Sequence, residues 1–160
     1  MAFKFSEENS KRIEEVIKKY PRKNAAVMPV LYLAQEQDGW ISQDVIREVA
    51  SILEITAEDV LGVVTFYSMY HTKPAGKYHL QVCTNVSCLL RGAADIYSHV
   101  KDKLKIDNGG VTGDNMFSLE EVECMGSCGT APMIAINEDF FENLNVQKVD
   151  EILGSLKSQN

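Results

Sequence analysis

Apolar residues recur at helical spacing through the first part of the chain, up to about residue 70. A first helix is predicted, with one buried face formed by Ile13, Val16, Ile17 and Tyr20. Pro21 ends this helix, because proline is not tolerated in a helix interior. A second helix is predicted from Asn24. Pro29 lies in its first turns, where proline is tolerated, and Asp38-Gly39 ends it.

Two further helices are predicted, each with a capping signal. Ser42 can accept a hydrogen bond from the first turn of a third helix. The buried face of that helix comprises Val45, Ile46, Val49, Ile52 and Leu53. Thr56 and Asp59 have the spacing of a capping box before a fourth helix, AEDVLGVVTFY. We therefore expect an N-terminal helical domain over residues 1–75.

Strand-like alternation begins after Pro74 and Gly76. In KYHLQVC the apolar positions of one face are Tyr78, Leu80 and Val82, which predicts a half-buried strand. Helical periodicity returns from Cys88 to Leu104, and DNGGVTGDN predicts a loop. MFSLEEVE predicts a second strand, whose alternation slips at Glu120-Glu121 and so suggests a β-bulge there.

The last part of the chain predicts a hairpin and a closing helix. MIAI and FFENL flank Asn137-Glu138-Asp139, a hairpin signature. Asn145 then caps a helix whose inward-facing residues are Val146, Val149, Ile152, Leu153 and Leu156. From residue 77 the order is β-α-β-β-β-α, which is thioredoxin-like in outline. We expect an α/β protein with an N-terminal helical bundle followed by a thioredoxin-like domain over residues 76–160.

Composition and charge narrow the possible partners. The chain has 160 residues, with 16 basic and 23 acidic side chains and a formal net charge of −7. Nucleic acids and anionic membranes attract basic patches, so neither is expected as a partner. The N-terminal segment indicates an amphipathic helix rather than a signal peptide, and no apolar run reaches the ~20 residues that span a bilayer. We therefore expect a cytoplasmic protein with reduced thiols, in which disulfides are disfavoured.

The chain's 4 cysteines form two close pairs, Cys83/Cys88 and Cys124/Cys128, with the spacings C-x4-C and C-x3-C. Each pair lies at the end of a predicted strand. In a β-α-β unit the two strands are parallel, and their ends lie at the same edge of the sheet. The topology therefore brings the four sulfur atoms to one corner of the domain. Four thiolates would repel one another there without a metal ion or cluster.

Three kinds of site compete for these cysteines. Zinc sites with four cysteine ligands are structural, but zinc ribbons and knuckles favour C-x2-C pairs. The longer spacers suit a [2Fe–2S] cluster, in which each iron takes two thiolates. Gly126 and Gly129 would let backbone N–H groups approach the sulfur atoms, which tunes such clusters. A thiol–disulfide enzyme would leave the first pair without a role and would depart from the usual C-x-x-C spacing.

Four stretches carry a family resemblance: PVLYLAQEQDGWIS, GVVTFYSMY, PAGKYHLQVCTNVSC and VECMGSCGTAPM. They resemble the thioredoxin-like [2Fe–2S] subunit of NADH:quinone oxidoreductase, the E subunit of bacterial complex I. The same family supplies small subunits of NAD-linked and electron-bifurcating hydrogenases and of formate dehydrogenases. The last two stretches are the most specific. The resemblance implies that the cluster ligands are Cys83, Cys88, Cys124 and Cys128.

The resemblance also implies a function. The protein would be an electron-carrier subunit of an oxidoreductase, non-catalytic and without a substrate site of its own. Its cluster would exchange single electrons with the flavin of a partner subunit, which alone binds FMN and NAD(H). Other iron–sulfur subunits would be further partners, and any membrane association would come through the larger complex. A hydrogenase or formate dehydrogenase is the alternative parent complex, and an interaction module built on a four-cysteine zinc site is the alternative of another class.

A few other residues could contribute to such a site. His71, His79 and His99 are possible ligands, but four cysteines complete a two-iron site, so we expect solvated or core histidines. Met125 is expected to be apolar cover over the cluster. Pro132 precedes a strand beside the cysteine segment, where thioredoxin-like folds often carry a cis-proline, although only ~5% of X–Pro bonds are cis. The sequence contains no G-x-G-x-x-G motif and no P-loop.

Overall fold

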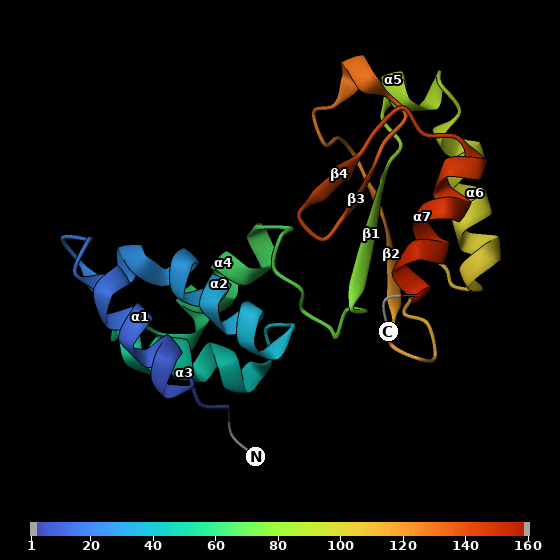
Figure 1. The fold of residues 1–160 in the computed structure, drawn as a ribbon. Helices are drawn as coiled ribbons and strands as arrows, with labels where there is room; N and C mark the ends of the chain where they lie inside the picture. Colours follow the sequence, from blue (N-terminus) through green and yellow to red (C-terminus); the bar gives the residue numbers. More distant parts are fainter. Residues whose placement is uncertain (1–2, 159–160) are drawn as a thin grey trace. The chain divides into compact units, whose positions relative to one another are not determined.

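The computed structural model describes residues 3–158 and divides the chain into two compact units, Met1–Pro74 and Ala75–Asn160. The first unit is helical, and the second combines a sheet with helices (Figure 1). This arrangement confirms the predicted α/β fold class, with a helical N-terminal region followed by the strands. Within residues 3–158, no helix combines the length and apolar character needed to cross a membrane.

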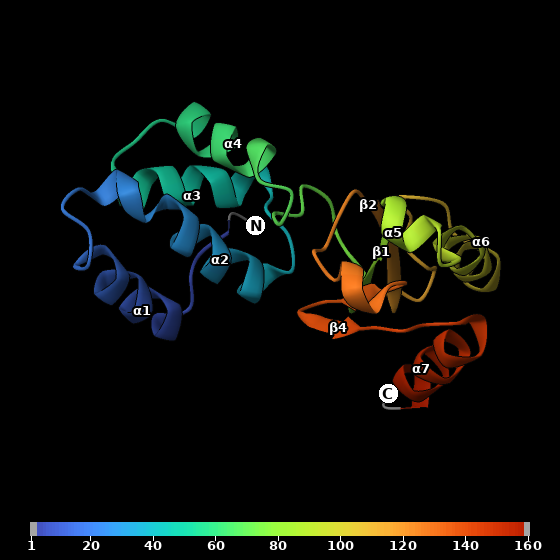
Figure 2. The ribbon, with the colours of Figure 1, turned by 90° about the horizontal axis from the view of Figure 1, so that it is seen from above.

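The first unit is built from α-helices that bury a common core. Its elements are α1 Glu7–Ile17, the 3₁₀ helix η1 Lys23–Ala26, α2 Val27–Asp38, α3 Gln43–Leu53 and α4 Ala57–Phe66. Within this unit α3 packs against α2 and α4 (Figure 2). The fully buried side chains of the core include Val30, Leu31, Val45, Val49, Val60 and Val64. Removal of this apolar surface from water is the main force that holds the helices together.

The ends of these helices are fixed by the predicted caps. The N–H of Val45 donates to Ser42 Oγ at 3.2 Å, at the start of α3. At the start of α4, Thr56 and Asp59 bind each other's backbone N–H groups, which completes the capping box. Gly39 ends α2 with φ 81°, in the left-handed region that favours glycine. All three predictions are confirmed.

Two boundaries in this unit differ from the predicted ones. The first helix ends at Ile17, and the N–H groups of Lys19 and Tyr20 then bond three residues back, to Val16 and Ile17. This tightened turn carries Tyr20 off the buried face, and its side chain is 39% exposed. The second helix begins at Val27 after η1, which places Pro29 in its first turn, where proline costs little.

The second unit contains the sheet. Its elements are β1 Tyr78–Cys83, α5 Val86–Leu89, α6 Ala93–Leu104, β2 Phe117–Val122, the 3₁₀ helix η2 Cys128–Thr130, β3 Ile134–Ile136, β4 Asp139–Phe141 and α7 Val146–Ser158. The strand order is β2-β1-β3-β4. β1 pairs parallel with β2 and antiparallel with β3, and β3 pairs antiparallel with β4. α6 and α7 pack together over the core on one face of the sheet (Figure 1).

The register of β1 and β2 runs unbroken from Tyr78↔Phe117 to Cys83↔Val122. The β-bulge suggested at Glu120-Glu121 is therefore absent. Glu121 lies on the helix-covered face by alternation, but it is exposed because it is near the end of the strand. The slip in the apolar pattern reflects this strand end rather than an extra residue in the ladder.

The connection between β1 and β2 is two helices rather than the one predicted. α5 ends at Leu89 and α6 begins at Ala93, with Gly92 between them at φ 96°. That backbone conformation suits glycine and interrupts the helical repeat. As a result Leu89 is 49% exposed and Leu90 is 84% exposed. The later apolar positions of the repeat, including Ala93, are buried, except that Tyr97 is only partly buried.

The predicted hairpin and final helix are both present. Asn137, at φ 55°, begins the turn between β3 and β4. The N–H of Lys148 donates to Asn145 Oδ1 at 2.9 Å, which confirms the cap of α7. Val149 is fully buried as predicted, whereas Val146 is 37% exposed. Val146 is the first residue of α7, so there is no preceding turn of helix against which its side chain can pack.

Candidate metal centre

Both cysteine pairs lie in segments that leave the sheet at the same edge. Cys83 is the last residue of β1, and its partner in the register is Val122, the last residue of β2. Cys88 lies in α5, Cys124 follows β2 closely, and Cys128 is the first residue of η2. The parallel pairing on which the predicted convergence depends is therefore present.

Cys83 and Cys88 are buried in a small group of packed side chains, separate from the main core of the sheet unit, whereas Cys124 and Cys128 are exposed. The other buried members of this group of side chains are Ala93, Ala131, Met133 and Ala135, with Val122 and Met125 packed against them. Most of these side chains are small, so the backbone comes close to the two sulfur atoms. The position of Met125 suits the apolar cover expected of it. The peptide bond between Ala131 and Pro132 is cis.

The pKa of the Cys83 thiol reports a polar environment around a buried sulfur atom. Burial opposes ionisation of Cys83. The backbone N–H groups of Asn85 and Met125 outweigh this effect, and hydrogen bonds with Cys88 and Cys124 add to them. The pKa of Cys83 is therefore lowered. The two backbone donors come from both cysteine segments, Asn85 from the first and Met125 from the second.

The pKa of the Cys88 thiol shifts in the opposite direction. Burial raises it to about 11, and a hydrogen bond with Cys83 and the charge of that side chain contribute to the rise. The backbone N–H of Met133 lowers the pKa, and the charge of Cys128 raises it further. At neutral pH Cys88 is therefore protonated unless a metal centre takes the place of its proton.

The second segment brings a backbone donor to its own sulfur atom. The N–H of Gly126 donates to Cys124 Sγ at 3.4 Å. Gly126 has φ 80°, a conformation that a side chain would oppose. The predicted approach of a backbone N–H group to a cysteine sulfur atom is thus confirmed at Gly126. Within the described residues 3–158, the N–H of Gly129 makes no hydrogen bond to a cysteine sulfur atom.

The donor chemistry of these residues fits a two-iron cluster. Such a cluster takes thiolate ligands in pairs, one pair to each iron, and is tuned by N–H groups that point at sulfur. Two pairs of cysteines and several N–H donors are present. Within the described part of the chain, no three His, Cys, Asp or Glu side chains come together closely enough to hold one metal ion.

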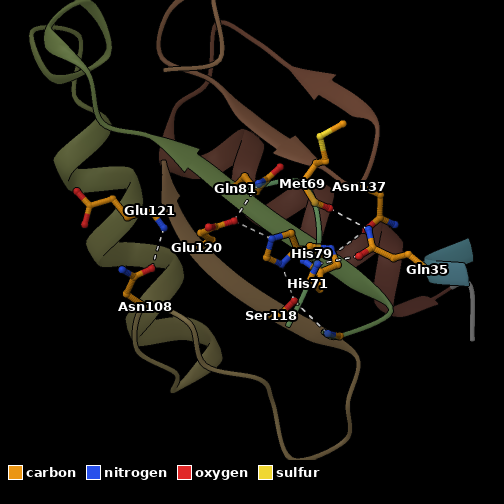
Figure 3. A network of polar contacts seen from close by, with 11 residues as sticks. Gln35, Met69, His71, His79, Gln81, Asn108, Ser118, Glu120, Glu121 and Asn137 are labelled. Carbon is orange, nitrogen blue, oxygen red and sulfur yellow. Dashed lines mark hydrogen bonds and ion pairs between the residues drawn. The ribbon is translucent and has the colours of Figure 1, made fainter. Parts of the chain in front are cut away.

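The three histidines have polar partners outside the cysteine segments. His79 Nδ1 is 2.8 Å from Ser118 Oγ, and His79 Nε2 is 3.0 Å from Glu120 Oε2 (Figure 3). His99 Nε2 is 2.6 Å from Asp150 Oδ1. In the helical unit, the backbone N–H of His71 donates to Gln35 Oε1 at 2.7 Å.

The network around His79 is a feature that the sequence pattern did not predict. Gln81 Nε2 donates to Glu120 Oε2 at 2.9 Å (Figure 3). The N–H of Gly76 donates to Ser118 Oγ at 3.0 Å. The parallel register places His79 opposite Ser118 and Gln81 opposite Glu120. A prediction of that register would have paired these polar positions in advance.

Comparisons with known proteins agree with this arrangement. A profile described as thioredoxin-like [2Fe–2S] ferredoxin matches residues 13–157. The E subunit of NADH-quinone oxidoreductase from Rickettsia bellii is 43% identical over 159 residues, which cover 98% of this chain and 95% of that protein. Subunit 2 of NADH-quinone oxidoreductase from Thermus thermophilus is 40% identical over 157 residues, covering 96% and 87%.

A solved structure shares the fold. The crystal structure of an NAD+-reducing [NiFe]-hydrogenase in the air-oxidized state matches with a TM-score of 0.74 and 18% identity. The match covers 83% of this chain but only 23% of the hydrogenase chain. The likeness extends to the fold alone.

Proposed function

This chain belongs to the thioredoxin-like [2Fe–2S] ferredoxin family, and we propose that it is the electron-transfer subunit of an NADH-oxidising complex. The cofactor of the family is a [2Fe–2S] cluster. The observation that carries the proposal is the placement of two cysteine pairs at one edge of the parallel β1–β2 pair. The relatives that match nearly the whole chain are named as subunits of NADH-quinone oxidoreductase.

The proposed ligands of the cluster are Cys83, Cys88, Cys124 and Cys128. The cluster, when bound, supplies one-electron chemistry. Cys88 must lose its proton to become a ligand, and its pKa of about 11 means that assembly releases this proton near neutral pH. The N–H groups of Asn85, Met125 and Gly126 donate to sulfur atoms and stabilise negative charge there. These donors belong to the backbone, so the fold holds them in place.

The proposed partner is a subunit that binds FMN and NADH. NADH gives up its electrons as a hydride, whereas an iron–sulfur cluster takes one electron at a time, so a flavin is needed between them. This chain contributes a carrier to the reaction, without a substrate site of its own. Other iron–sulfur subunits would receive the electrons within the same complex. The assembly would work in the cytoplasm or at a membrane to which other subunits attach it.

A hydrogenase or a formate dehydrogenase remains the alternative parent complex. The hydrogenase likeness supports the fold only, because its identity is 18%. The relatives named as quinone oxidoreductase subunits are 40–43% identical over 96–98% of the chain. This difference favours the quinone oxidoreductase.

The experiment that tests the carrier role combines the purified chain with its flavin subunit. NADH should reduce the [2Fe–2S] cluster of this chain, and so produce its electron paramagnetic resonance signal, only when the flavin subunit is present. A chain that NADH reduces equally well alone would contradict the proposed division of roles. A colourless chain that contains one zinc would support the interaction module instead.

A further inference from the structure

The segment that carries Cys128 is tied to the chain that follows β4. The N–H of Asn143 donates to the carbonyl oxygen of Thr130 at 2.7 Å, and the N–H of Leu144 donates to that of Pro132 at 3.1 Å. Asn143 has φ 50°, a left-handed conformation that asparagine tolerates. These two bonds hold the residue before Asn143, which is Glu142, beside the cysteine segment.

Glu142 offers one carboxylate oxygen to two hydroxyl groups. Thr130 Oγ1 donates to Glu142 Oε1 at 2.6 Å, and Ser127 Oγ donates to the same oxygen. The two hydroxyl oxygens are 2.7 Å apart. Ser127 directly precedes Cys128, and Thr130 is the last residue of η2. The three side chains therefore join both ends of the short helix that begins at Cys128.

We propose that Glu142 is a positioning residue that holds Cys128 in place for cluster ligation. This inference rests on the proposed role of Cys128 as a ligand. Glu142 does not bind the cluster and acts through Ser127 and Thr130.

Two properties of the segment show why it needs such a contact. A 3₁₀ helix has poor hydrogen-bond geometry and gains little stability from its own backbone. Cys124 and Cys128 are exposed, so little apolar burial fixes the segment. Hydrogen bonds that a carboxylate accepts are stronger than those between neutral groups. Glu142 therefore adds hydrogen bonds to a segment that apolar packing holds only weakly.

The test compares variants of the full-length protein with the cluster assembled. Glu142→Ala removes the acceptor, and Glu142→Gln keeps an acceptor oxygen without the charge. Glu138→Ala is the matched control, because Glu138 is exposed in the β3–β4 turn and its loss changes the net charge equally. The readouts are the rate at which a ferrous chelator removes iron and the g values of the reduced cluster.

Glu142→Ala should lose iron roughly three- to tenfold faster than the wild type and should shift the g values, as expected for the loss of a contact of this kind. The iron-release rate of Glu142→Gln should lie between those of the wild type and Glu142→Ala, and that of Glu138→Ala should equal the wild-type rate. When Ser127→Ala and Thr130→Val are already present, Glu142→Ala should add no further acceleration, because all three changes remove the same contact.

Unchanged rates and g values in Glu142→Ala would overturn the inference, and so would an equal acceleration in Glu138→Ala. If circular dichroism shows that Glu142→Ala does not fold, Glu142→Gln decides the matter alone. A wild type without iron would overturn the proposed function and this inference with it. If the wild type holds the cluster and all the variants have its iron-release rate and its g values, only this inference is overturned.

Discussion

Cys83 and Val122 are partners in one parallel register, and each is the last residue of its strand. Parallel strands leave a sheet in the same direction, so the segments after them start from adjacent points. A chain extends at most ~3.3–3.6 Å per residue, which limits how far a nearby residue can lie from its strand end. Cys88 and Cys124 both follow these strand ends closely. The β-α-β unit thus suits a site built from two cysteine pairs.

Replacement of Cys128 by serine should abolish or sharply weaken cluster binding. The change leaves one iron with a single thiolate and a harder oxygen ligand in place of the other. The measurement is iron and acid-labile sulfide per chain, with the visible absorption spectrum.

Met125→Leu is the control for that replacement. Met125 packs against the buried side chains around Cys83 and Cys88, and leucine has a similar volume. Iron content should stay at the wild-type level, with a modest change in reduction potential at most. Loss of the cluster in Met125→Leu, together with its retention in Cys128→Ser, would refute the ligand assignment.

A fragment of residues 74–160 should assemble the cluster. The sheet unit from Ala75 onward contains all four cysteines and has its own apolar core between the sheet and α6 and α7. Metal ligation adds to folding stability where the ligands converge. Iron content of the isolated fragment checks this expectation, and a fragment that holds no iron would refute it.

The same fragment should bind the flavin subunit much more weakly than the full chain. The helical unit exposes apolar side chains near its end, with Phe66 79% exposed and Met69 42% exposed, and these can contribute to docking. Co-purification of the flavin subunit with each form measures the difference. Equal retention by the fragment and the full chain would show that the helical unit has no part in docking.

Gly76→Ala should destabilise the sheet unit by about 1–3 kcal/mol. A Cβ atom at Gly76 would lie 2.4 Å from the backbone carbon of Phe117, so the two chain segments would have to move apart. Gly113→Ala is the control, because its Cβ would have no atom within 4 Å. Urea unfolding of both variants measures the effect, and equal stability would contradict it.

Thr56→Ala should lower the stability of the helical unit by ~1 kcal/mol, the usual effect of a lost N-cap. Its hydroxyl accepts the N–H of Asp59 at 3.1 Å. Thr65→Ala is the control within the same helix: Thr65 Oγ1 donates to the carbonyl of Leu61, and alanine favours an exposed helical position. Thermal unfolding should separate the two variants, whereas an equal loss would argue against the cap. The iron content of both should match the wild type.

Local signals in the sequence predict much of the fold. Caps at Ser42 and Thr56 mark two helix starts, because a side-chain acceptor for the first-turn N–H groups acts within a few residues. The break between α5 and α6 is harder to predict, because Leu89 and Leu90 continue the apolar pattern although both are exposed. Their exposure depends on Gly92 and on the path of the chain around the cysteines, which the periodicity does not contain.

Part of the candidate site can likewise be predicted from the sequence, and part depends on the tertiary structure. The spacing of the cysteines and the β-α-β order are enough to place them at one edge of the sheet. The contact of Glu142 with Ser127 and Thr130 requires β4 to return beside the cysteine segment, which is a tertiary relationship. The pairing of His79 with Ser118 depends on the strand register, which the pattern of each strand alone leaves open.

The most direct test of the central claim is the metal content of the purified wild-type chain, together with the paramagnetic resonance spectrum of its reduced form. A two-iron site with four cysteine ligands predicts about two irons and two sulfides per chain, with a one-electron paramagnetic signal after reduction. One zinc per chain, with no visible absorption and no signal after reduction, would contradict the account.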